Sequence, residues 1–315
     1  MRFTGEPRQC QKLDEESAIA AFAAKADLVW IDISAIEREP VKELLEQRFG
    51  FHRLEIEDAL YSSERPTLRA QGDEAFLATP AVTRVEGAER FTQVGFFVGP
   101  TYLVTVAVGP TPILDHWFAS CLAQPKLGQN VSYILHSLLD GIVDAYFPVL
   151  DGLSDDIEDL EDCIYEGGPV NVGEALALKK RLLEMRRRIT PIRDVLNSLL
   201  RRDVTFLPED SKPYFQDVYD HTLRISETAD IERDILSAVL DAHLSVTSNR
   251  LNQVMRTLTV IATVLMSMAL ISGIYGMNFK YMPELEWRYG YAFALALMVL
   301  VGIAEVVVFR KIKWL

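Results

Sequence analysis

The sequence predicts an α+β membrane protein, with an N-terminal α/β domain, two charged helices, one very long helix and a C-terminal transmembrane hairpin. Two apolar runs near the C-terminus, at about 258–275 and 291–309, indicate the hairpin. Each is long enough to cross a bilayer, which takes roughly 17–25 apolar residues in a helix. Ahead of them, residues 1–125 mix strand and helix patterns, whereas the pattern from 126 onward is helical. We therefore expect the hairpin to carry residues 1–257 outside the membrane.

The composition favours a protein that handles cations. The 315 residues include 45 acidic and 32 basic side chains, and the net charge is -13. A basic surface is the usual sign of nucleic-acid binding, so we expect no nucleic-acid partner. Three cysteines without metal-ligand spacing indicate ordinary thiols in a reducing compartment. The histidines form no ligand pair and no nucleophile arrangement is visible, so we expect neither an enzyme nor an organic cofactor. They are His52, His116, His136, His221 and His243.

Basic residues flank both ends of the hairpin, whereas the loop between the two runs has mixed charge. The flanking residues are Arg250 and Arg256 before the first run, and Arg310, Lys311 and Lys313 after the second. Cytoplasmic flanks of membrane spans are enriched in Lys and Arg. We therefore expect a multi-pass protein of the cell membrane, in contact with lipids, with both termini in the cytoplasm. The N-terminus lacks the apolar core of a signal peptide.

Residues 1–125 predict a small cytoplasmic α/β domain with a mixed sheet. Strand patterns occur at 27–33, 74–85 and 91–108, and glycines and prolines mark the turns. A helical pattern covers 37–49. Because the domain shows no nucleophile or phosphate-loop spacing, it gives no sign of chemistry of its own.

Residues 126–212 predict an acidic helix and a basic helix. The first begins near 132 and carries acidic side chains to 162, and the second covers 172–202 and is strongly basic. The Gly-Gly-Pro sequence at 167–169 separates them. A short connection favours an antiparallel pair with complementary faces. Two solvated charged faces are an open alternative, because exposed ion pairs contribute little.

One helix is predicted to run from Tyr214 to Ile274, since no proline interrupts the sequence between Pro213 and Pro283. Helices of this length imply a coiled coil or a bundle with other copies. A single hairpin encloses no aqueous path, so a pore would need several subunits around an axis. We divide this part into a stalk at 213–257, a first span at 258–275, an outer loop at 276–290, a second span at 291–309 and a basic tail at 310–315.

A stripe of residues spaced by three or four follows one side of the first span. It is polar at the inner end, apolar in the middle and small at the outer end. The stripe consists of Asn252, Met255, Leu258 or Thr259, Ala262, Met266, Ala269, Gly273 and Gly276. Small residues allow helices to approach closely, so the stripe suits helix packing as well as pore lining.

The end of the first span carries a motif, Tyr275-Gly276-Met277-Asn278-Phe279, followed by Met282-Pro283-Glu284-Leu285 and a final Lys313-Trp314-Leu315. This combination resembles the CorA magnesium-channel family, the Gly-Met-Asn metal ion transporters. Stretches at 51–58, 65–66, 213–221 and 248–255 also match, so the resemblance covers nearly the whole chain after about residue 25. It implies a funnel-shaped homopentamer, in which 213–275 line the pore and 126–212 form charged "willow" helices. It also implies a channel that conducts Mg²⁺, with Co²⁺ or Ni²⁺ as further candidates, into the cytoplasm.

By this resemblance the selectivity filter comprises Gly276, Met277 and Asn278. Mg²⁺ sheds its water reluctantly, and a ring of neutral carboxamides can bind the hydrated ion weakly enough to release it. The gate and the inner polar ring fall on Asn252, Met255, Leu258, Met266 and Ala269. Family members often have a hydroxyl residue in place of Ala269 and a proline in place of Ser267. Glu284 and Glu286 in the outer loop either attract cations or are ordinary solvated charges.

The resemblance also implies a regulatory metal site at subunit contacts. By position it comprises Glu57, Asp58 and Asp140 on one subunit and Asp217 on its neighbour, where bound cytoplasmic Mg²⁺ would hold the channel closed.

Two other hypotheses for the function are a Zn²⁺ or other transition-metal transporter of the same family, and a non-conducting, membrane-tethered scaffold. A carboxylate within the second span, Glu305, is expected to extend toward Arg310 or Arg256 at the inner membrane surface.

Overall fold

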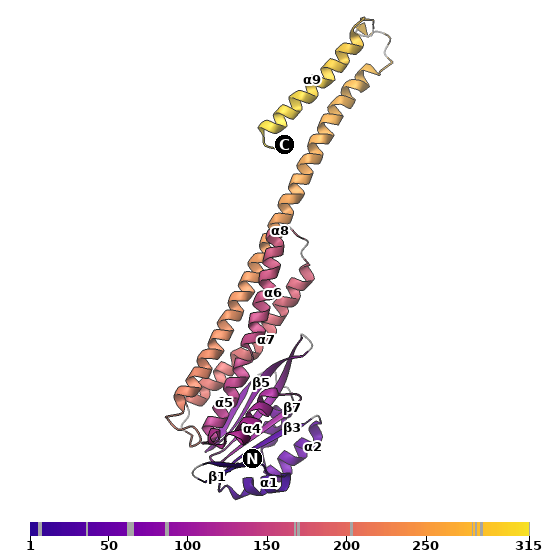
Figure 1. Ribbon diagram of the computed structural model, residues 1–315. Coiled ribbons are helices and arrows are strands. Elements are labelled where there is room, and N and C mark those ends of the chain that lie inside the picture. The colour runs from indigo at the N-terminus through magenta and orange to yellow at the C-terminus, as the bar shows by residue number, and fades with distance from the viewer. Residues whose placement is uncertain are drawn as a thin grey trace. The chain divides into compact units, whose positions relative to one another are not determined.

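The fold is described from a computed structural model of the chain (Figure 1). The structure describes residues 1–5, 8–35, 37–61, 66–85, 88–166, 168, 171–201, 204–278, 280, 282–283 and 286–314. The chain divides into two compact units, Met1–Ala238 and Val239–Leu315. We consider each unit by itself.

A seven-stranded mixed sheet forms the centre of the first unit. Its strand order is β2-β1-β3-β7-β6-β5-β4, and β3 and β7 are parallel while the other neighbours are antiparallel. The strands are β1 (Arg2–Thr4), β2 (Gln9–Gln11), β3 (Leu28–Ala35), β4 (Thr67–Gln71), β5 (Glu74–Val85), β6 (Ala88–Val98) and β7 (Tyr102–Val108). The mixed sheet predicted for the N-terminal domain is therefore confirmed. The strands β1, β2 and β4 are too short to give a clear pattern in the sequence.

Helices cover both faces of this sheet. On one face lie α1 (Glu15–Ala24), α2 (Arg38–Leu44), a π-helical turn η1 (Leu45–Phe49) and α3 (Arg53–Leu60). Alternate strand residues, such as Tyr102, Val104 and Val106, pack with Phe22 and Ile56 in a buried cluster on that face. On the other face lie α4 (Pro112–Ala123), a 3₁₀ turn η2 (Pro125–Leu127) and α5 (Val131–Asp144), where Trp30 contacts Phe118 of α4.

The acidic segment predicted as one helix is interrupted. It consists of α5 (Val131–Asp144) and α6 (Phe147–Tyr165), and Pro148 lies in the first turn of α6. Proline suits the first turn of a helix and cannot donate to the preceding turn, so it favours a new start here. Tyr146 at the junction is fully buried, and its hydroxyl donates to the carbonyl of Pro80 over 2.9 Å.

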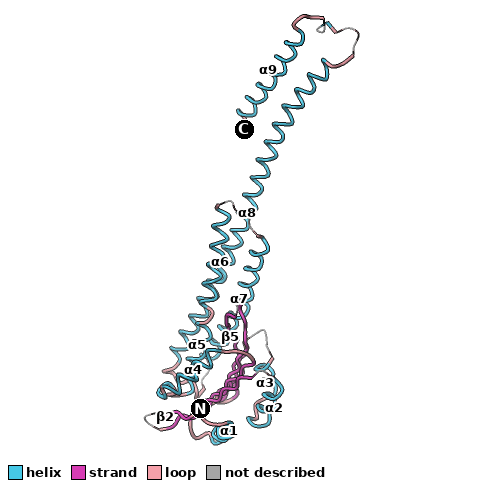
Figure 2. Tube along the Cα trace, turned by 45° about the vertical axis from the view of Figure 1, so that its right-hand side comes forward, coloured by secondary structure: helices cyan, strands magenta, loops and turns pink. Residues whose placement is uncertain are grey.

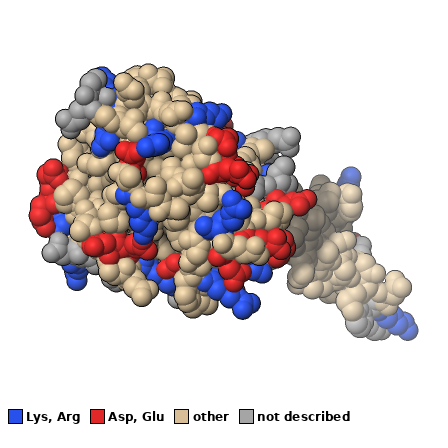
Figure 3. Space-filling model, turned by 90° about the horizontal axis from the view of Figure 1, so that it is seen from below, with Lys and Arg blue, Asp and Glu red and all other residues tan. Residues whose placement is uncertain are grey.

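Three helices pack along one another beyond the sheet (Figures 1 and 2): α6, α7 (Val172–Leu200) and the first part of α8 (Lys212–Tyr275). Arg181 of α7 pairs with Asp156 of α6 at 2.9 Å and also with Glu89 of β6. Arg186 of α7 pairs with Asp230 of α8 at 2.9 Å. The basic helix therefore contacts β6 and α8 as well as the acidic helix. Seen from the end that carries α1, acidic and basic side chains are interspersed (Figure 3).

The second unit consists of the C-terminal part of α8 and α9 (Gly290–Lys311), which form a hairpin. Three segments of the described chain are long and apolar enough to cross a membrane. In Val131–Tyr165, 56% of the most apolar 18-residue stretch is buried within the protein. The buried share of the corresponding stretch is 6% in α8 and 11% in α9. Because the first segment already supplies the core of its unit, the exposed apolar surfaces of α8 and α9 are the ones that suit lipid.

Candidate cation pathway and metal site

The predicted pore stripe lies on an exposed face of α8. Met255 is 58% exposed, Leu258 59% and Met266 71%. Asn252 and Ala269 are also exposed. This face is therefore free to contact other copies of the chain or an aqueous path.

The other helix of the hairpin, α9, covers a different face of α8. Gly302 of α9 lies so close that a Cβ at this position would be 2.9 Å from Cε of Met268 and 3.8 Å from Cγ1 of Val264. Val260, one turn before Val264, is only 5% exposed. At about 100° per residue, the stripe lies roughly 180° around α8 from these contacts. The hairpin thus buries one face of α8 and presents the stripe on the opposite face.

The predicted selectivity residues lie directly beyond the C-terminus of α8. The amide of Gly276 donates to the carbonyl of Ser272 over 2.9 Å, and the amide of Met277 donates to Ile274 over 3.3 Å. Asn278 follows, exposed and outside the helix. The last carbonyls of a helix give its C-terminus a partial negative charge, which favours cations. Asn278 therefore follows a helix end whose field attracts positive ions.

The connection from α8 to α9 combines charge with aromatic residues. Glu286 is exposed, whereas Glu284 lies outside the described residues. At the start of α9, the ring of Trp287 lies 5.7 Å from Phe293 and 6.3 Å from Tyr289. Aromatic residues are enriched where membrane spans meet water, so this cluster suits the outer end of a spanning hairpin.

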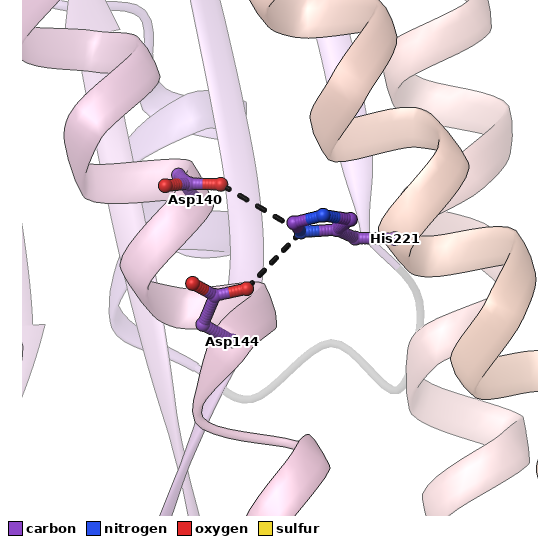
Figure 4. A group of neighbouring side chains, drawn as sticks. All are labelled: Asp140, Asp144 and His221. Carbon is purple, nitrogen blue, oxygen red and sulfur yellow. Dashed lines mark hydrogen bonds and ion pairs between the residues drawn. The ribbon is translucent and has the colours of Figure 1, made fainter.

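A cluster of possible metal ligands joins α5 to α8 (Figure 4). Nδ1 of His221 lies 3.1 Å from Oδ1 of Asp144 and 3.9 Å from Oδ1 of Asp140. All three residues offer ligand atoms within 4.8 Å of one another. Asp217, one turn before His221, places Oδ2 3.9 Å from Nε2 of the same ring. Carboxylate oxygens suit Mg²⁺, and imidazole suits Co²⁺, Ni²⁺ and Zn²⁺.

The negative charges of Asp140 and Asp144 repel each other, and a bound cation would offset this repulsion. Burial raises the pKa of Asp140, and the negative charge of Asp144 raises it further. Burial lowers the pKa of the nearby His136, although Asp140 and Asp217 act in the opposite direction. Crowded carboxylates disfavour ionisation, and a divalent ion between them would reverse this effect. The cluster is therefore electrostatically suited to bind a cation.

The other two predicted regulatory residues lie elsewhere in the chain. Glu57 and Asp58 are on α3, whereas Asp140 is on α5, and these helices cover opposite faces of the sheet. Asp58 forms an ion pair with Arg69 of β4 at 2.7 Å. Within one chain, the structure therefore brings together Asp140 and Asp217 but does not add Glu57 and Asp58 to them.

Sequence reasoning missed Asp144 and His221. It dismissed the histidines because no two of them have ligand spacing, and that test overlooks mixed ligand pairs. The usable signal is the spacing of four residues, from Asp140 to Asp144 and from Asp217 to His221, which places each pair on one face of its helix. Their meeting across two helices depends on the packing of α5 against α8, which the sequence does not show.

The expectation for Glu305 was wrong. Oε1 of Glu305 accepts a hydrogen bond of 2.5 Å from the hydroxyl of Ser267 on α8. In the described part of the chain, Glu305 forms no ion pair with Arg310 or Arg256. The carboxyl group therefore points toward the neighbouring helix rather than along its own helix to the inner membrane surface.

Comparison with known proteins identifies the family. Residues 25–311 match the family described as CorA-like Mg2+ transporter protein. The chain belongs to the CorA family. It is 35% identical to the cobalt/magnesium transport protein CorA of Thermotoga maritima, over 98% of this chain and 90% of the relative. It is 33% identical to the putative metal ion transporter YfjQ of Bacillus subtilis, over 90% of this chain and 89% of the relative.

Two solved structures have the same fold. The complete structure of the CorA magnesium transporter from Methanocaldococcus jannaschii matches with a TM-score of 0.82 and 25% identity, over 98% of this chain and 95% of that chain. The full-length CmaX structure matches with a TM-score of 0.75 at 20% identity, which shows the fold alone. The protein is therefore a CorA-family divalent cation transporter of the membrane and not an enzyme, and the predicted fold class is confirmed.

Proposed function

We propose that this CorA protein is a Mg²⁺ channel that assembles as a homopentamer and admits Mg²⁺ into the cytoplasm. The observation that carries the proposal is the exposed stripe of α8, which lies opposite the face covered by α9 and is followed closely by Asn278. In a ring of five subunits this face would line a central path. Residues 213–257 would form the cytoplasmic stalk, 258–275 and 291–309 the two spans, and both termini would be cytoplasmic.

Five Asn278 carboxamides would select the ion at the outer mouth, together with backbone groups of Gly276 and Met277. Neutral amides can hydrogen-bond the water shell of Mg²⁺ without binding the bare ion too tightly to release it. The C-terminus of α8 adds a favourable field for cations. Glu286, and Glu284 nearby in the sequence, would raise the local cation concentration.

Met255, Leu258 and Met266 would form the gate. Their exposed apolar side chains would meet around the axis, and a narrow apolar constriction blocks ions by losing its water. Asn252 would form a polar ring on the inner side. Ala269 offers no hydroxyl group to hydrate an ion between the gate and the outer ring.

Cytoplasmic Mg²⁺ would act as a regulatory ion as well as the transported one. The cluster of Asp140, Asp144 and His221, with Asp217 beside it, would hold the ion, and Glu57 and Asp58 would join from a subunit contact. A bound cation would remove the repulsion between carboxylates and favour the closed, symmetric ring. Loss of the cation would allow the subunits to separate and the gate to fill with water.

Mg²⁺ uptake by proteoliposomes tests the proposal. We expect uptake with low Mg²⁺ on the cytoplasmic face and strong inhibition with millimolar Mg²⁺ there. Asn278→Ala should reduce the preference for Mg²⁺ over Ca²⁺ about tenfold or more, since one altered ring position changes every permeating ion. Asn249→Ala is the matched control, because Asn249 is exposed on α8 but lies on the side of α9 by helical geometry.

Two outcomes would contradict the channel. Absence of uptake under both conditions, with correctly inserted protein, would favour a non-conducting scaffold. An equal preference for Mg²⁺ over Ca²⁺ in the wild type and in Asn278→Ala would remove the outer ring from selectivity. A second candidate is transport of Co²⁺ or another transition metal, with the same ion sensed at the regulatory cluster, because the imidazole of His221 suits such an ion. Competition between Mg²⁺ and Co²⁺ in the same assay separates these two candidates.

A further inference from the structure

A hydrogen bond between two spanning helices has no role in the pathway described above. The hydroxyl of Ser267 on α8 donates to Oε1 of Glu305 on α9 over 2.5 Å. Both side chains are half-buried between the helices. The second carboxyl oxygen, Oε2, is buried and has no hydrogen-bond partner among the described residues. The carboxyl group of Glu305 therefore lies between α8 and α9 and does not face lipid.

The depth of this contact makes it hard to replace. Ser267 lies eight residues before Tyr275, about 12 Å from the outer end of α8, near the middle of the apolar run. No water is available at that depth to bind a separated hydroxyl or carboxyl group. Rotating or sliding α8 against α9 would leave both groups unpaired, so the hydrogen bond opposes such movement.

The rest of the contact between α8 and α9 is apolar. Gly302 of α9 has no side chain, and it faces the flexible side chain of Met268 and a methyl group of Val264. Among the described residues of the hairpin, the Ser267–Glu305 contact is the one side-chain hydrogen bond between the two helices. Apolar contacts of this kind are compatible with several rotational positions of α8 about its own axis, whereas the hydrogen bond can form in one of them.

We propose that Ser267 and Glu305 form an intrasubunit clasp that fixes the rotation of α8, so that its opposite face presents the gate residues to the axis. Glu305 is then a positioning residue for conduction and does not itself contact the ion. This inference rests on the proposed channel function. It differs from a role in which Glu305 attracts cations to the inner mouth, because that role requires only the charge of Glu305 and not Ser267.

A double-mutant cycle in proteoliposomes tests the clasp. Ser267→Ala and Glu305→Val should each change Mg²⁺ flux per pentamer by about three- to fifteen-fold, the range expected for one hydrogen bond between membrane helices. The double variant should be no worse than the stronger single variant, because both remove the same interaction. Glu305→Gln keeps an oxygen that accepts from the hydroxyl, so its flux should stay within about twofold of the wild type.

A second measurement reads the helix contact without flux. Val264→Cys and Gly302→Cys place two thiols across the contact, in a background in which Cys10, Cys121 and Cys163 are replaced by Ser. Disulfide formation within a subunit should be fast in this background and several-fold slower when Ser267→Ala is added.

The outcomes separate the clasp from the channel. Additive flux changes, a silent Ser267→Ala, or equal losses in Glu305→Gln and Glu305→Val would each overturn the clasp. Unchanged flux per pentamer with a reduced yield of pentamers would show a merely structural contact and would also overturn it. Absence of flux in the wild type would contradict the channel, and the cross-linking rates would then decide the clasp alone.

Discussion

Asp32 lies in the first unit, where burial disfavours the charged form of its carboxyl group. It lies on β3, on the sheet face covered by α4, and Oδ1 accepts a hydrogen bond of 2.5 Å from the Thr105 hydroxyl. The same hydroxyl accepts from the indole of Trp30 over 3.1 Å. Burial raises the pKa of Asp32, and its hydrogen bonds with Thr105 and Ser34 only partly oppose that effect. The protonated form is therefore favoured by folding.

This environment predicts how Asp32→Asn alters stability with pH. A carboxyl group with a raised pKa in the folded state contributes stability that is fully present below its unfolded pKa and is lost as the pH rises through the folded pKa. Asparagine does not titrate and so escapes this loss. The variant should unfold at a higher temperature than the wild type near pH 7, and the difference should shrink toward pH 4. Thermal unfolding of the purified protein from pH 4 to 8 measures it.

Asp73→Asn provides the comparison for Asp32. Asp73 is exposed in the turn between β4 and β5, so the same loss of charge should produce a curve parallel to that of the wild type. A difference between Asp32→Asn and the wild type that stays constant with pH would contradict the role assigned to burial.

At the scale of elements, Gly95 allows α3 to approach the sheet. A Cβ at this position of β6 would lie 2.6 Å from Cβ and 3.2 Å from Cα of Ala59 on α3. Because one of these atoms belongs to the backbone, the helix itself would have to move. Gly95→Ala should therefore lower the free energy of unfolding by about 1–3 kcal/mol, the usual cost of overpacking a core.

Denaturant unfolding measures this cost, and Gly152→Ala is the matched control. Gly152 lies within α6, where a Cβ would meet only the flexible guanidinium of Arg84, at 3.2 Å. Alanine is about 1 kcal/mol more favourable than glycine in a helix interior, so the control should be neutral or stabilising. Equal stability of Gly95→Ala and the wild type would show that α3 tolerates displacement from the sheet.

The elements that could be predicted from the sequence were those with a long, regular pattern. The helix expected from Tyr214 to Ile274 is present as Lys212–Tyr275, because no proline or polar break interrupts it. The break at Tyr146 was missed because apolar spacing continues through α5 and α6, although Pro148 in the first turn of α6 is a signal for a new helix start. The buried hydrogen bond from Tyr146 to Pro80 then holds the junction in place. The short strand β1 was missed for a related reason, since three residues carry too little pattern and its pairing with β3 decides it.

In the candidate cation pathway and metal site, too, regular spacing could be predicted from the sequence and contacts between elements could not. The stripe on α8 follows from helical spacing and could be read directly, whereas its position opposite α9 could not. Asp140 and Asp217 were predicted through the family resemblance, whereas the position of the His221 imidazole between them depends on tertiary packing. The partner of Glu305 was assigned to the wrong residue because proximity in sequence favoured Arg310. The actual contact with Ser267 crosses between two helices.

At the scale of the whole molecule, the metal cluster and the gate would be linked by one continuous helix. α8 carries Asp217 and His221 near its start and Leu258 further along, with no interruption from Lys212 to Tyr275. A helix transmits displacement along its length because its backbone hydrogen bonds resist bending. In the proposed channel, a change at the cation cluster would therefore reach the proposed gate through α8 without a separate signalling element. Five subunits that change together would make closure steeply dependent on Mg²⁺.

Asp217→Ala is the variant that tests this linkage. The side chain of Asp217 is 67% exposed, so its removal should leave the fold intact while weakening the cation cluster beside His221. We expect closure of the assembled channel to need about tenfold more cytoplasmic Mg²⁺, a typical size for one allosteric coupling, with flux at low Mg²⁺ unchanged. Flux into proteoliposomes over a range of cytoplasmic Mg²⁺ measures the midpoint of closure, and native mass spectrometry determines whether the variant assembles as the wild type does. Glu227→Ala removes an exposed carboxylate further along α8 and should leave the midpoint where it is. If both variants shift the midpoint equally, closure responds to the general negative charge of the helix and not to the cluster at Asp217.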